Sequence, residues 1–318
     1  MKQSETSVIK APVAIFIYKR PDLVKGLIHA ISAYQPGKLY IVADGPKAEG
    51  GQPESQLCAE ARRVAEVGVN WPCEVKRVYA ISNMGLRVRL ESGLDEVFIN
   101  ETEAILLEED CHPMPDFFPF CQEMLTRYRE NPRIAGIAGN CFLPIQAPIS
   151  SSYFYSRFLH IWGWATWRRV WKEYDRSKWE WPTEGIRRYF PKSRPDEIRY
   201  WNLVYSRVAS GQIDTWDYRW TSHLWSRGLL AIVPSQNLIW NRGFGASATN
   251  TRDEDMDAGI ERELPLPPPY TGSGPIQAGE ELDRMVFENH FLRTEGKKSL
   301  WGKLMARLRK TPFRLGRQ

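Results

Sequence analysis

The sequence predicts an α/β fold in which a mostly parallel, twisted sheet is flanked by helices. Three observations predict it. Short apolar runs alternate with stretches of helical periodicity, and the links between them are short, as in parallel sheets covered by helices. The apolar run 104–107 is followed at once by Glu108, Glu109 and Asp110. Three carboxylates are therefore expected at the carboxyl end of a buried strand, where open α/β sheets bind their ligands.

The first half of the chain contains the clearest alternation. Strands are expected at 13–18, 39–43, 74–79 and 104–109. The helices between them are expected over about 22–33, near 54–67, and from Asn83-Met84-Gly85 to about 98. A further helix is expected after Asp116, which is a good capping residue. Its apolar face would hold Phe117, Cys121, Met124, Leu125 and Tyr128.

The second half has a different composition. Eleven of the 13 tryptophans lie between Trp162 and Trp240. We expect helices at about 163–173, 196–209 and 217–228 and a strand at 229–233. Residues 252–279 are acidic and then rich in proline and glycine, which is typical of a loop or extended arm.

The composition excludes several classes of protein. Residues 1–10 lack the apolar core of a signal peptide, and no stretch approaches the roughly 18 apolar residues of a membrane span. The five cysteines form no Cys-x-x-Cys pair, which favours free thiols in a reducing compartment over disulfides or a zinc site. The net charge of +5 is concentrated in residues 291–318, so the rest of the chain is slightly acidic and has no general nucleic-acid footprint.

Polar residues at the predicted strand ends indicate a nucleotide site. Clustered acids at 108–110 are costly unless something positive lies among them, and a divalent metal holding a diphosphate would meet that need. Arg20, Arg87 and Arg89 suit a diphosphate, and Asp44 suits a base or ribose edge. The first strand is followed by neither Gly-x-Gly-x-x-Gly nor Gly-x-x-x-x-Gly-Lys. A dinucleotide fold and a P-loop are therefore excluded, and the alternative for the acids is a solvated turn.

Four segments follow one another over roughly residues 11–245. The first runs from Gly85-Leu86 through Leu94 to Val97-Phe98. The second is Glu108-Glu109-Asp110 followed by Pro115-Asp116-Phe117-Phe118. The third is Trp162-Gly163-Trp164-Ala165-Thr166-Trp167 with Trp171, and the fourth is Trp216-Asp217-Tyr218-Arg219-Trp220. In this order they resemble GT-A glycosyltransferases of the N-acetylglucosaminyltransferase I type and, more closely, bacterial family-2-like glycosyltransferases.

The resemblance implies a role for individual residues. Asp110 would bridge the metal, Mn²⁺ or Mg²⁺, with help from Glu109, and Glu108 would face the donor site. Asp44 would meet the nucleobase or ribose, and Arg89 would lie near the diphosphate. Asp217 would be the general base of an inverting transfer, because the acceptor hydroxyl must lose a proton as it attacks the anomeric carbon.

Each assignment has a plainer alternative. Asp217 stands where a helix begins and could be a cap, and Asp214 is the rival base. Asp44 could serve only its turn, and Arg87 and Arg89 could lie on a solvated helix face. Most tryptophans are expected in the core, with Trp164, Trp216 and Trp220 as candidates for the acceptor or sugar site. His112 is expected at the surface.

The resemblance also implies a domain layout. Residues 1–10 would be a tail and 11–250 a GT-A catalytic domain, with its nucleotide-binding half at 11–110 and its acceptor half at 111–250. An arm at 251–290 and a basic amphipathic tail at 291–318 would follow. Related bacterial sequences often carry Gly-Phe-Gly…Ala-Thr-His-Thr, but Asn250 stands in place of that histidine in Gly243-Phe244-Gly245…Ala248-Thr249-Asn250-Thr251. This departure puts the metal affinity in doubt.

The expected function is therefore metal-dependent transfer of a sugar from a nucleotide-diphospho-sugar to a glycan or lipid-linked acceptor, in bacterial cell-surface glycan assembly. The enzyme is expected in the cytoplasm, with residues 297–310 as a contact to an anionic membrane surface; a helix packed on the body or a dimer contact is the alternative for the tail. Two other functions remain open. One is a sugar-nucleotide nucleotidyltransferase, although Lys19-Arg20-Pro21-Asp22 replaces its usual glycine-rich loop. The other is a catalytically silent carbohydrate-binding protein.

Overall fold

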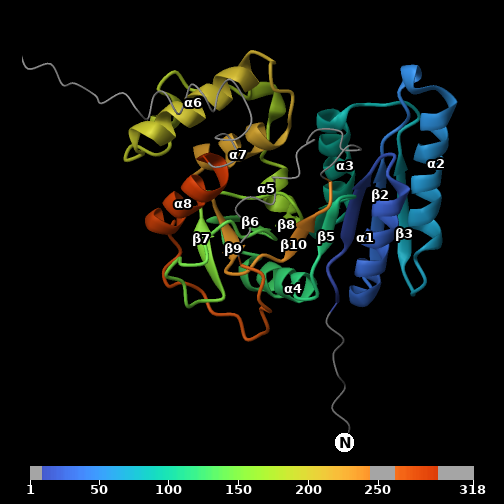
Figure 1. Cartoon of the computed structure of the whole chain (residues 1–318), viewed down its shortest axis with the longest axis horizontal. Helices are drawn as coiled ribbons and strands as arrows, with labels where there is room; N and C mark the ends of the chain where they lie inside the picture. Colours follow the sequence, from blue (N-terminus) through green and yellow to red (C-terminus); the bar gives the residue numbers. More distant parts are fainter. Residues whose placement is uncertain (1–8, 244–261, 293–318) are drawn as a thin grey trace, which may run out of the picture.

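The computed structural model of the chain describes residues 9–243 and 262–292. Its first half alternates strands and helices as predicted (Figure 1). The strands are β1 (Val13–Ile17), β2 (Lys38–Ala43), β3 (Glu74–Tyr79) and β4 (Glu103–Glu108). The helices are α1 (Pro21–Tyr34), α2 (Gly51–Val67), α3 (Leu86–Asn100) and α4 (Phe117–Tyr128).

A large mixed sheet forms the centre of the described structure. Its eight strands follow the order β3-β2-β1-β4-β8-β6-β9-β7, which adds β6 (Ile134–Ala138), β7 (Tyr153–Ser156), β8 (Trp164–Trp167) and β9 (Leu230–Pro234). Strands β8 and β7 run against their neighbours, and the other pairings are parallel. The predicted α/β fold, with a mostly parallel sheet flanked by helices, is confirmed. Strands β1, β2 and β4 are parallel neighbours, so their carboxyl ends meet at one edge.

Helices cover the sheet along its length. Helix α3 packs on β1, β2 and β4 and contacts the short α5 (Arg168–Trp171), while α1 packs against α2. At the other end, α6 (Pro195–Ala209), α7 (Asp217–Ser226) and α8 (Glu280–Val286) gather beside β7 and β9 (Figure 1). A second sheet pairs β5 (Cys111–Pro113) with β10 (Ile239–Asn241). Short helical turns also occur among the described residues: the 3₁₀ turns Ala48–Gly50, Arg176–Lys178 and Gly185–Arg188, and a π-helical turn at Phe287–Leu292.

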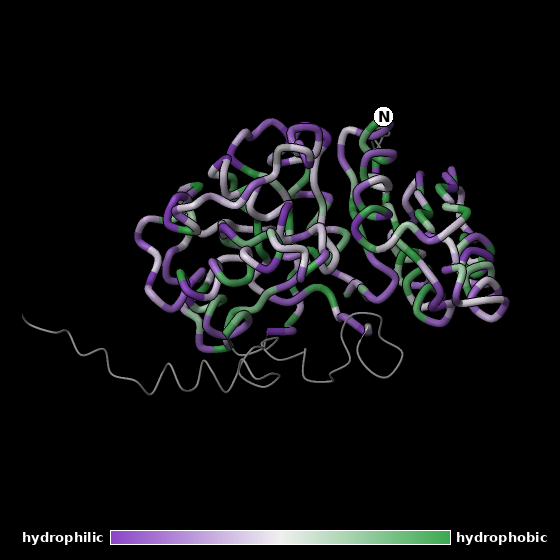
Figure 2. The backbone as a smooth tube through the Cα atoms, turned by 90° about the horizontal axis from the view of Figure 1, so that it is seen from above, coloured by the Kyte–Doolittle hydropathy of each residue, from purple (hydrophilic) through white to green (hydrophobic). Residues whose placement is uncertain are grey.

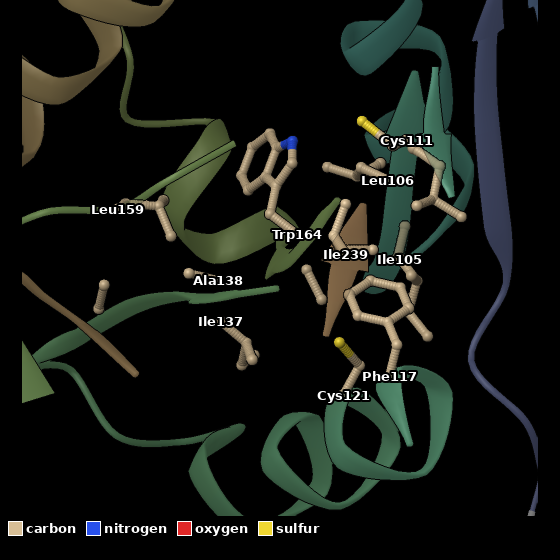
Figure 3. Close-up of a cluster of buried hydrophobic side chains, with 14 of the residues drawn as sticks. Ile105, Leu106, Cys111, Phe117, Cys121, Ile137, Ala138, Leu159, Trp164 and Ile239 are labelled. Carbon is tan, nitrogen blue, oxygen red and sulfur yellow. The ribbon is translucent and has the colours of Figure 1, made fainter. Parts of the chain in front are cut away.

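The core lies between the sheet and these helices. Figure 3 shows side chains of β4, β6, β8, β10 and α4 converging on Trp164, Phe117 and Ile239. All three of these side chains are buried. The tube in Figure 2 shows hydrophilic stretches following the outer loops of the body. The strand ends of the first half are thus held in place by a continuous packed interior.

Two predictions from the sequence are wrong. Residues 163–173 do not form one helix, because residues 164–167 form β8, between β4 and β6, and only Arg168–Trp171 is helical. All four side chains of β8 are buried, so the run shows neither helical nor alternating periodicity. Asp116 stands at the N-cap position of α4 but makes no capping hydrogen bond. Its Oδ2 instead accepts a hydrogen bond from the Leu266 N–H at 2.8 Å, which holds the segment after residue 261.

The C-terminal described segment folds back onto the body. Residues 262–279 form no helix or strand, and α8 then docks beside β7, with the Gly279 N–H donating to Tyr155 O at 3.0 Å. Asp283 accepts hydrogen bonds from Ser156 Oγ at 2.5 Å and from the Arg157 N–H at 3.2 Å. Asn250 and the tail 297–310 lie outside the described residues. Among the described helices, none has the length and apolar character needed to cross a bilayer.

Candidate functional site

A cavity of about 290 Å³ opens at the carboxyl ends of β1, β2 and β4. Six of the residues singled out from the sequence line it: Arg20, Asp44, Arg89, Glu108, Glu109 and Asp110. They come from four separate segments of the chain. Their meeting follows from the parallel pairing of the three strands, since parallel strands deliver their carboxyl ends to the same edge.

Asp44 lies at the end of β2 and is buried. One carboxylate oxygen accepts hydrogen bonds from the Gly45 N–H at 2.8 Å and the Met84 N–H at 2.9 Å. The other accepts from Asn83 Nδ2 at 2.9 Å. Asp44 therefore ties the turn after β2 to the loop before α3, and it also presents its carboxylate to the cavity.

Arg89 is buried and also lines the cavity. Its Nη2 donates to Val78 O at 2.6 Å, and its Nε has no hydrogen-bond partner within the described residues. Burial lowers the pKa of this guanidinium, and Asp44 acts against that shift. The side chain thus belongs to the wall beside Asp44 at the start of α3.

The acids after β4 are held by Arg20. Its Nε lies 2.6 Å from Glu109 Oε1 and its Nη2 lies 2.9 Å from Asp110 Oδ2. Burial acts to lower the pKa of Arg20, but the two carboxylates outweigh it and raise the pKa. Glu109 Oε2 also accepts a hydrogen bond from the Tyr18 N–H, so both of its oxygens are engaged by the protein. Glu109 therefore fixes the end of β1 and orients Arg20.

The side chain of Glu108 has no hydrogen-bond or ion-pair partner within the described residues. Burial, together with the charges of Asp110, Asp217 and Glu109, raises the pKa of Glu108 to about 8. The contribution of Asp217 is informative, because that residue lies more than a hundred positions away in the sequence. It places Asp217 close enough to Glu108 for their charges to interact.

The residues that line the first cavity fit a divalent cation only if phosphate oxygens of the donor supply the remaining ligands. Asp110 Oδ2 is engaged by Arg20, whereas the only neighbour of Oδ1 within the described residues is Cys111 Sγ at 3.8 Å, a weak contact. In the described ranges no set of three His, Cys, Asp or Glu side chains is arranged to hold a metal. With Glu108 protonated at neutral pH, the two carboxylates of Glu109 and Asp110 against the one guanidinium of Arg20 still leave a net negative charge at the end of β4, which suits a cation shared between Asp110 and phosphate oxygens.

Asp217 begins α7 and lines a second cavity, of about 280 Å³. Its carboxylate accepts a hydrogen bond from the Thr215 hydroxyl. Burial raises the pKa of Asp217, although hydrogen bonds from Thr215 and from the Tyr218 and Asp217 N–H groups act to lower it. This carboxylate therefore lines the second cavity, and its charge acts on Glu108 of the first.

Other sequence candidates lie elsewhere. Arg87 Nε pairs with Asp214 Oδ1 at 2.7 Å, and Asp214 is 70% exposed. Neither residue lines the first or the second cavity. His112 is half-buried in β5, and burial lowers its pKa.

The three candidate tryptophans lie in the core. Trp164, Trp216 and Trp220 are each at most 3% exposed. The Trp164 ring lies 5.8 Å from that of Trp216 and 6.3 Å from that of Trp220. Rings so enclosed have no free face for a sugar, and their packing instead supports the start of α7, where Asp217 lies.

The structure adds residues that the sequence did not single out as site residues. Lys47, Asn83 and Gly243 also line the first cavity. A Cβ built on Gly243 would lie 2.2 Å from Asp110 Oδ2, and the Arg242 N–H donates to Asp110 O at 2.8 Å. The only signal for this contact was the Gly243-Phe244-Gly245 motif, of which only Gly243 is described.

Comparisons with known proteins show little similarity. The sequence matches no family model and no curated protein. Among solved structures, UDP-glucose pyrophosphorylase complexed with UDP-glucose aligns at 10% identity with a TM-score of 0.24. The alignment covers 41% of this chain and 63% of that chain, which is less than two thirds of its length. A likeness at this level carries no information about function.

Proposed function

We propose that the chain is an inverting GT-A glycosyltransferase that uses a nucleotide-diphospho-sugar. The single observation that carries the proposal is the placement of Asp217, an oriented carboxylate that lines an aromatic-walled cavity and whose charge acts on Glu108 in the acidic strand-end cavity. A single displacement needs a base within hydrogen-bond reach of the acceptor hydroxyl, and that hydroxyl must itself reach the donor's anomeric carbon.

The first cavity would hold the donor. Asp44 would accept hydrogen bonds from the nucleobase or ribose, as acids after the second strand do in open sheets. Arg20, already held by Glu109 and Asp110, would offset charge on the diphosphate. Glu108 would face the sugar side of the cavity, since the charge of Asp217 acts on its pKa.

Asp217 would take the proton from the acceptor hydroxyl. The hydroxyl oxygen then forms a bond to the anomeric carbon as the bond to the diphosphate oxygen breaks. The product has the opposite anomeric configuration, and the nucleoside diphosphate leaves. Bound at Asp110, Mn²⁺ or Mg²⁺ would supply charge stabilisation of the leaving diphosphate.

A panel of nucleotide-diphospho-sugars tests the proposal. The protein is incubated with each member and Mn²⁺ or Mg²⁺, and released nucleotide is measured with and without a chelator. Slow release of nucleoside diphosphate by water is expected with one donor, and the chelator should abolish it. A nucleotidyltransferase would instead join a nucleoside triphosphate to a sugar 1-phosphate and release pyrophosphate. Absence of donor binding by every member of the panel would overturn the proposal.

A further inference from the structure

The second cavity is built from five segments that are far apart in the sequence. They are the segment after β6, with Phe142; the loop 158–162 before β8; part of α6; the start of α7; and the C-terminal described turn at 290–291. At about 280 Å³ it falls just below the roughly 300–1,000 Å³ of sites for drug-sized ligands. A single sugar-sized ring suits this volume.

Aromatic rings form its walls. The Trp162 ring lies 5.7 Å from the Phe142 ring and is partly exposed, as is Phe291. Asp217 and Thr221 bring polar groups to the edge on the α7 side. Apolar faces with a few fixed polar groups are typical of a site that orients a small ligand.

His160 carries the strongest indication of a ligand. Its side chain is only 9% exposed and lines the cavity, yet its Nε2 has no hydrogen-bond partner within the described part of the chain. It packs edge-on against Phe142, with ring centroids 4.6 Å apart. A buried imidazole nitrogen without a partner is costly, and a ligand hydroxyl would satisfy it.

The chemistry of the lining selects the class of ligand. Burial holds the pKa of His160 well below its ordinary value, so the ring is neutral and offers one donor and one acceptor. The lining contains no Lys or Arg to bind an anion. No set of three ligands for a metal occurs in the described ranges. A neutral ring with an apolar face and a hydroxyl rim fits these walls, whereas a uronic acid would meet Asp217 with no cation to offset its charge.

We propose that this cavity is the acceptor subsite and takes one neutral pyranose ring, which packs against the aromatic walls and forms a hydrogen bond with His160 through a hydroxyl. The proposal rests on the proposed function, because it makes Asp217 the base for another hydroxyl of the same ring. His160 is then a specificity-determining residue for the acceptor and makes no contact with the nucleotide.

Saturation-transfer NMR with methyl glycosides tests the proposed acceptor subsite. The probes are the methyl glycosides of glucose, galactose, mannose, N-acetylglucosamine and N-acetylgalactosamine, with methyl glucuronoside as the charged comparison. His160→Phe keeps the ring and removes its hydrogen bonds. His223→Phe is the matched control, because His223 is a half-buried histidine of α7 outside the cavity and its Nε2 also lacks a partner in the described structure.

The wild type should transfer saturation to at least one neutral glycoside and not to the glucuronoside. His160→Phe should weaken that binding about ten-fold or more, while His223→Phe leaves it unchanged. If His160→Phe lowers the melting temperature, the near-isosteric Thr221→Val serves the same purpose at the edge of the cavity.

Nucleotide binding, measured separately by calorimetry with the nucleoside diphosphates, separates the two proposals. Unchanged nucleotide binding with no glycoside bound, or with equal glycoside binding by both histidine variants, would overturn the acceptor subsite alone. Glycoside binding that depends on His160, in a chain that binds no nucleotide, would support the sugar subsite and overturn the transferase.

Discussion

Asp217 and Asp214 are three positions apart in the sequence, but they differ in exposure and in their partners. Asp217 is oriented by the hydrogen bond from Thr215, and its charge raises the pKa of Glu108. Asp214 is exposed and paired with Arg87. We expect Asp217→Asn to lower transfer by about 10²–10⁴-fold, the usual contribution of a general base, with donor binding unchanged. Turnover of the best donor checks this, with Asp214→Asn as the matched control. Near-normal transfer by Asp217→Asn would disprove the base assignment.

Asp110 is the residue on which metal-dependent donor binding should depend. In Asp110→Asn, Glu109 still pairs with Arg20. The substitution removes the charged carboxylate, whose Oδ1 Arg20 does not engage and which would bind the cation. We expect Asp110→Asn to abolish the increase in nucleoside diphosphate affinity that Mn²⁺ gives the wild type. Calorimetric titrations with and without the cation measure this increase. Asp22→Asn, an exposed acid of α1, is the control and should retain it; an equal increase in both variants would contradict the role.

The sequence could indicate these residues because chemistry and strand position leave a local signal. Acids directly after an apolar run stand at a strand end wherever the run is a parallel strand, and Asp44, Glu108 and Asp110 do reach one cavity. Whether a tryptophan faces a ligand or the core has no such signal. Trp164 proved buried and Trp162, two residues earlier, lines a cavity, because the backbone around Gly163, with φ +64°, separates their environments.

At the scale of elements, α3 owes its position on the sheet to Gly93. A Cβ there would lie 2.5 Å from Val42 Cγ1 and 2.7 Å from Phe16 Cε1, and both side chains are buried. We expect Gly93→Ala to destabilise the fold by about 1–3 kcal/mol through overpacking, despite the better helix propensity of alanine.

Gly26 provides the matched control within α1, because nothing lies within 4 Å of a Cβ built there. Gly26→Ala should stabilise the fold by about 0.5–1 kcal/mol. Denaturant midpoints of the two variants against the wild type measure both effects. A Gly93→Ala variant as stable as Gly26→Ala would show that α3 can move away from the sheet freely.

The elements predicted best were those with a clear periodicity of apolar residues and with turn or capping residues at their ends. Helices α6 and α7 and strand β9 lie where the sequence predicted them, within a few residues. Strands β6 and β8 were not predicted, because both are buried and pair with strands that are distant in the sequence. Strand β8, for example, lies between β4 and β6. Such a run carries no alternation, and only its partners in the sheet decide its state.

At the scale of the whole molecule, the C-terminal described segment completes the acceptor side. Residues 290–291 form part of the second cavity, although sequence composition indicated only an arm around 251–290. The docking depends on α8, whose Asp283 is buried against β7 and lies 3.6 Å from Arg157 Nε. Contacts of this kind join positions more than a hundred residues apart, so local sequence could not reveal them.

Asp283 should make the stability of this docking depend on pH. Burial, only partly offset by Arg157, raises the pKa of Asp283 from 3.8 to about 6. The folded state therefore holds the proton more tightly than the unfolded state does. This contribution to stability is fully present below about pH 4 and is lost as the pH rises through 6, a total of about 3 kcal/mol.

We expect the free energy of unfolding of the wild type to fall relative to that of Asp283→Asn between pH 4 and 6, and the difference to be constant above pH 7. Denaturant unfolding of both proteins across this range measures it, and the subtraction removes the titration of other groups. Glu281→Gln, on the exposed face of the same helix, is the control and should give a flat difference. A flat difference for Asp283→Asn as well would mean that Arg157 fully compensates the buried charge, and that the docked segment tolerates an ionised Asp283 without cost.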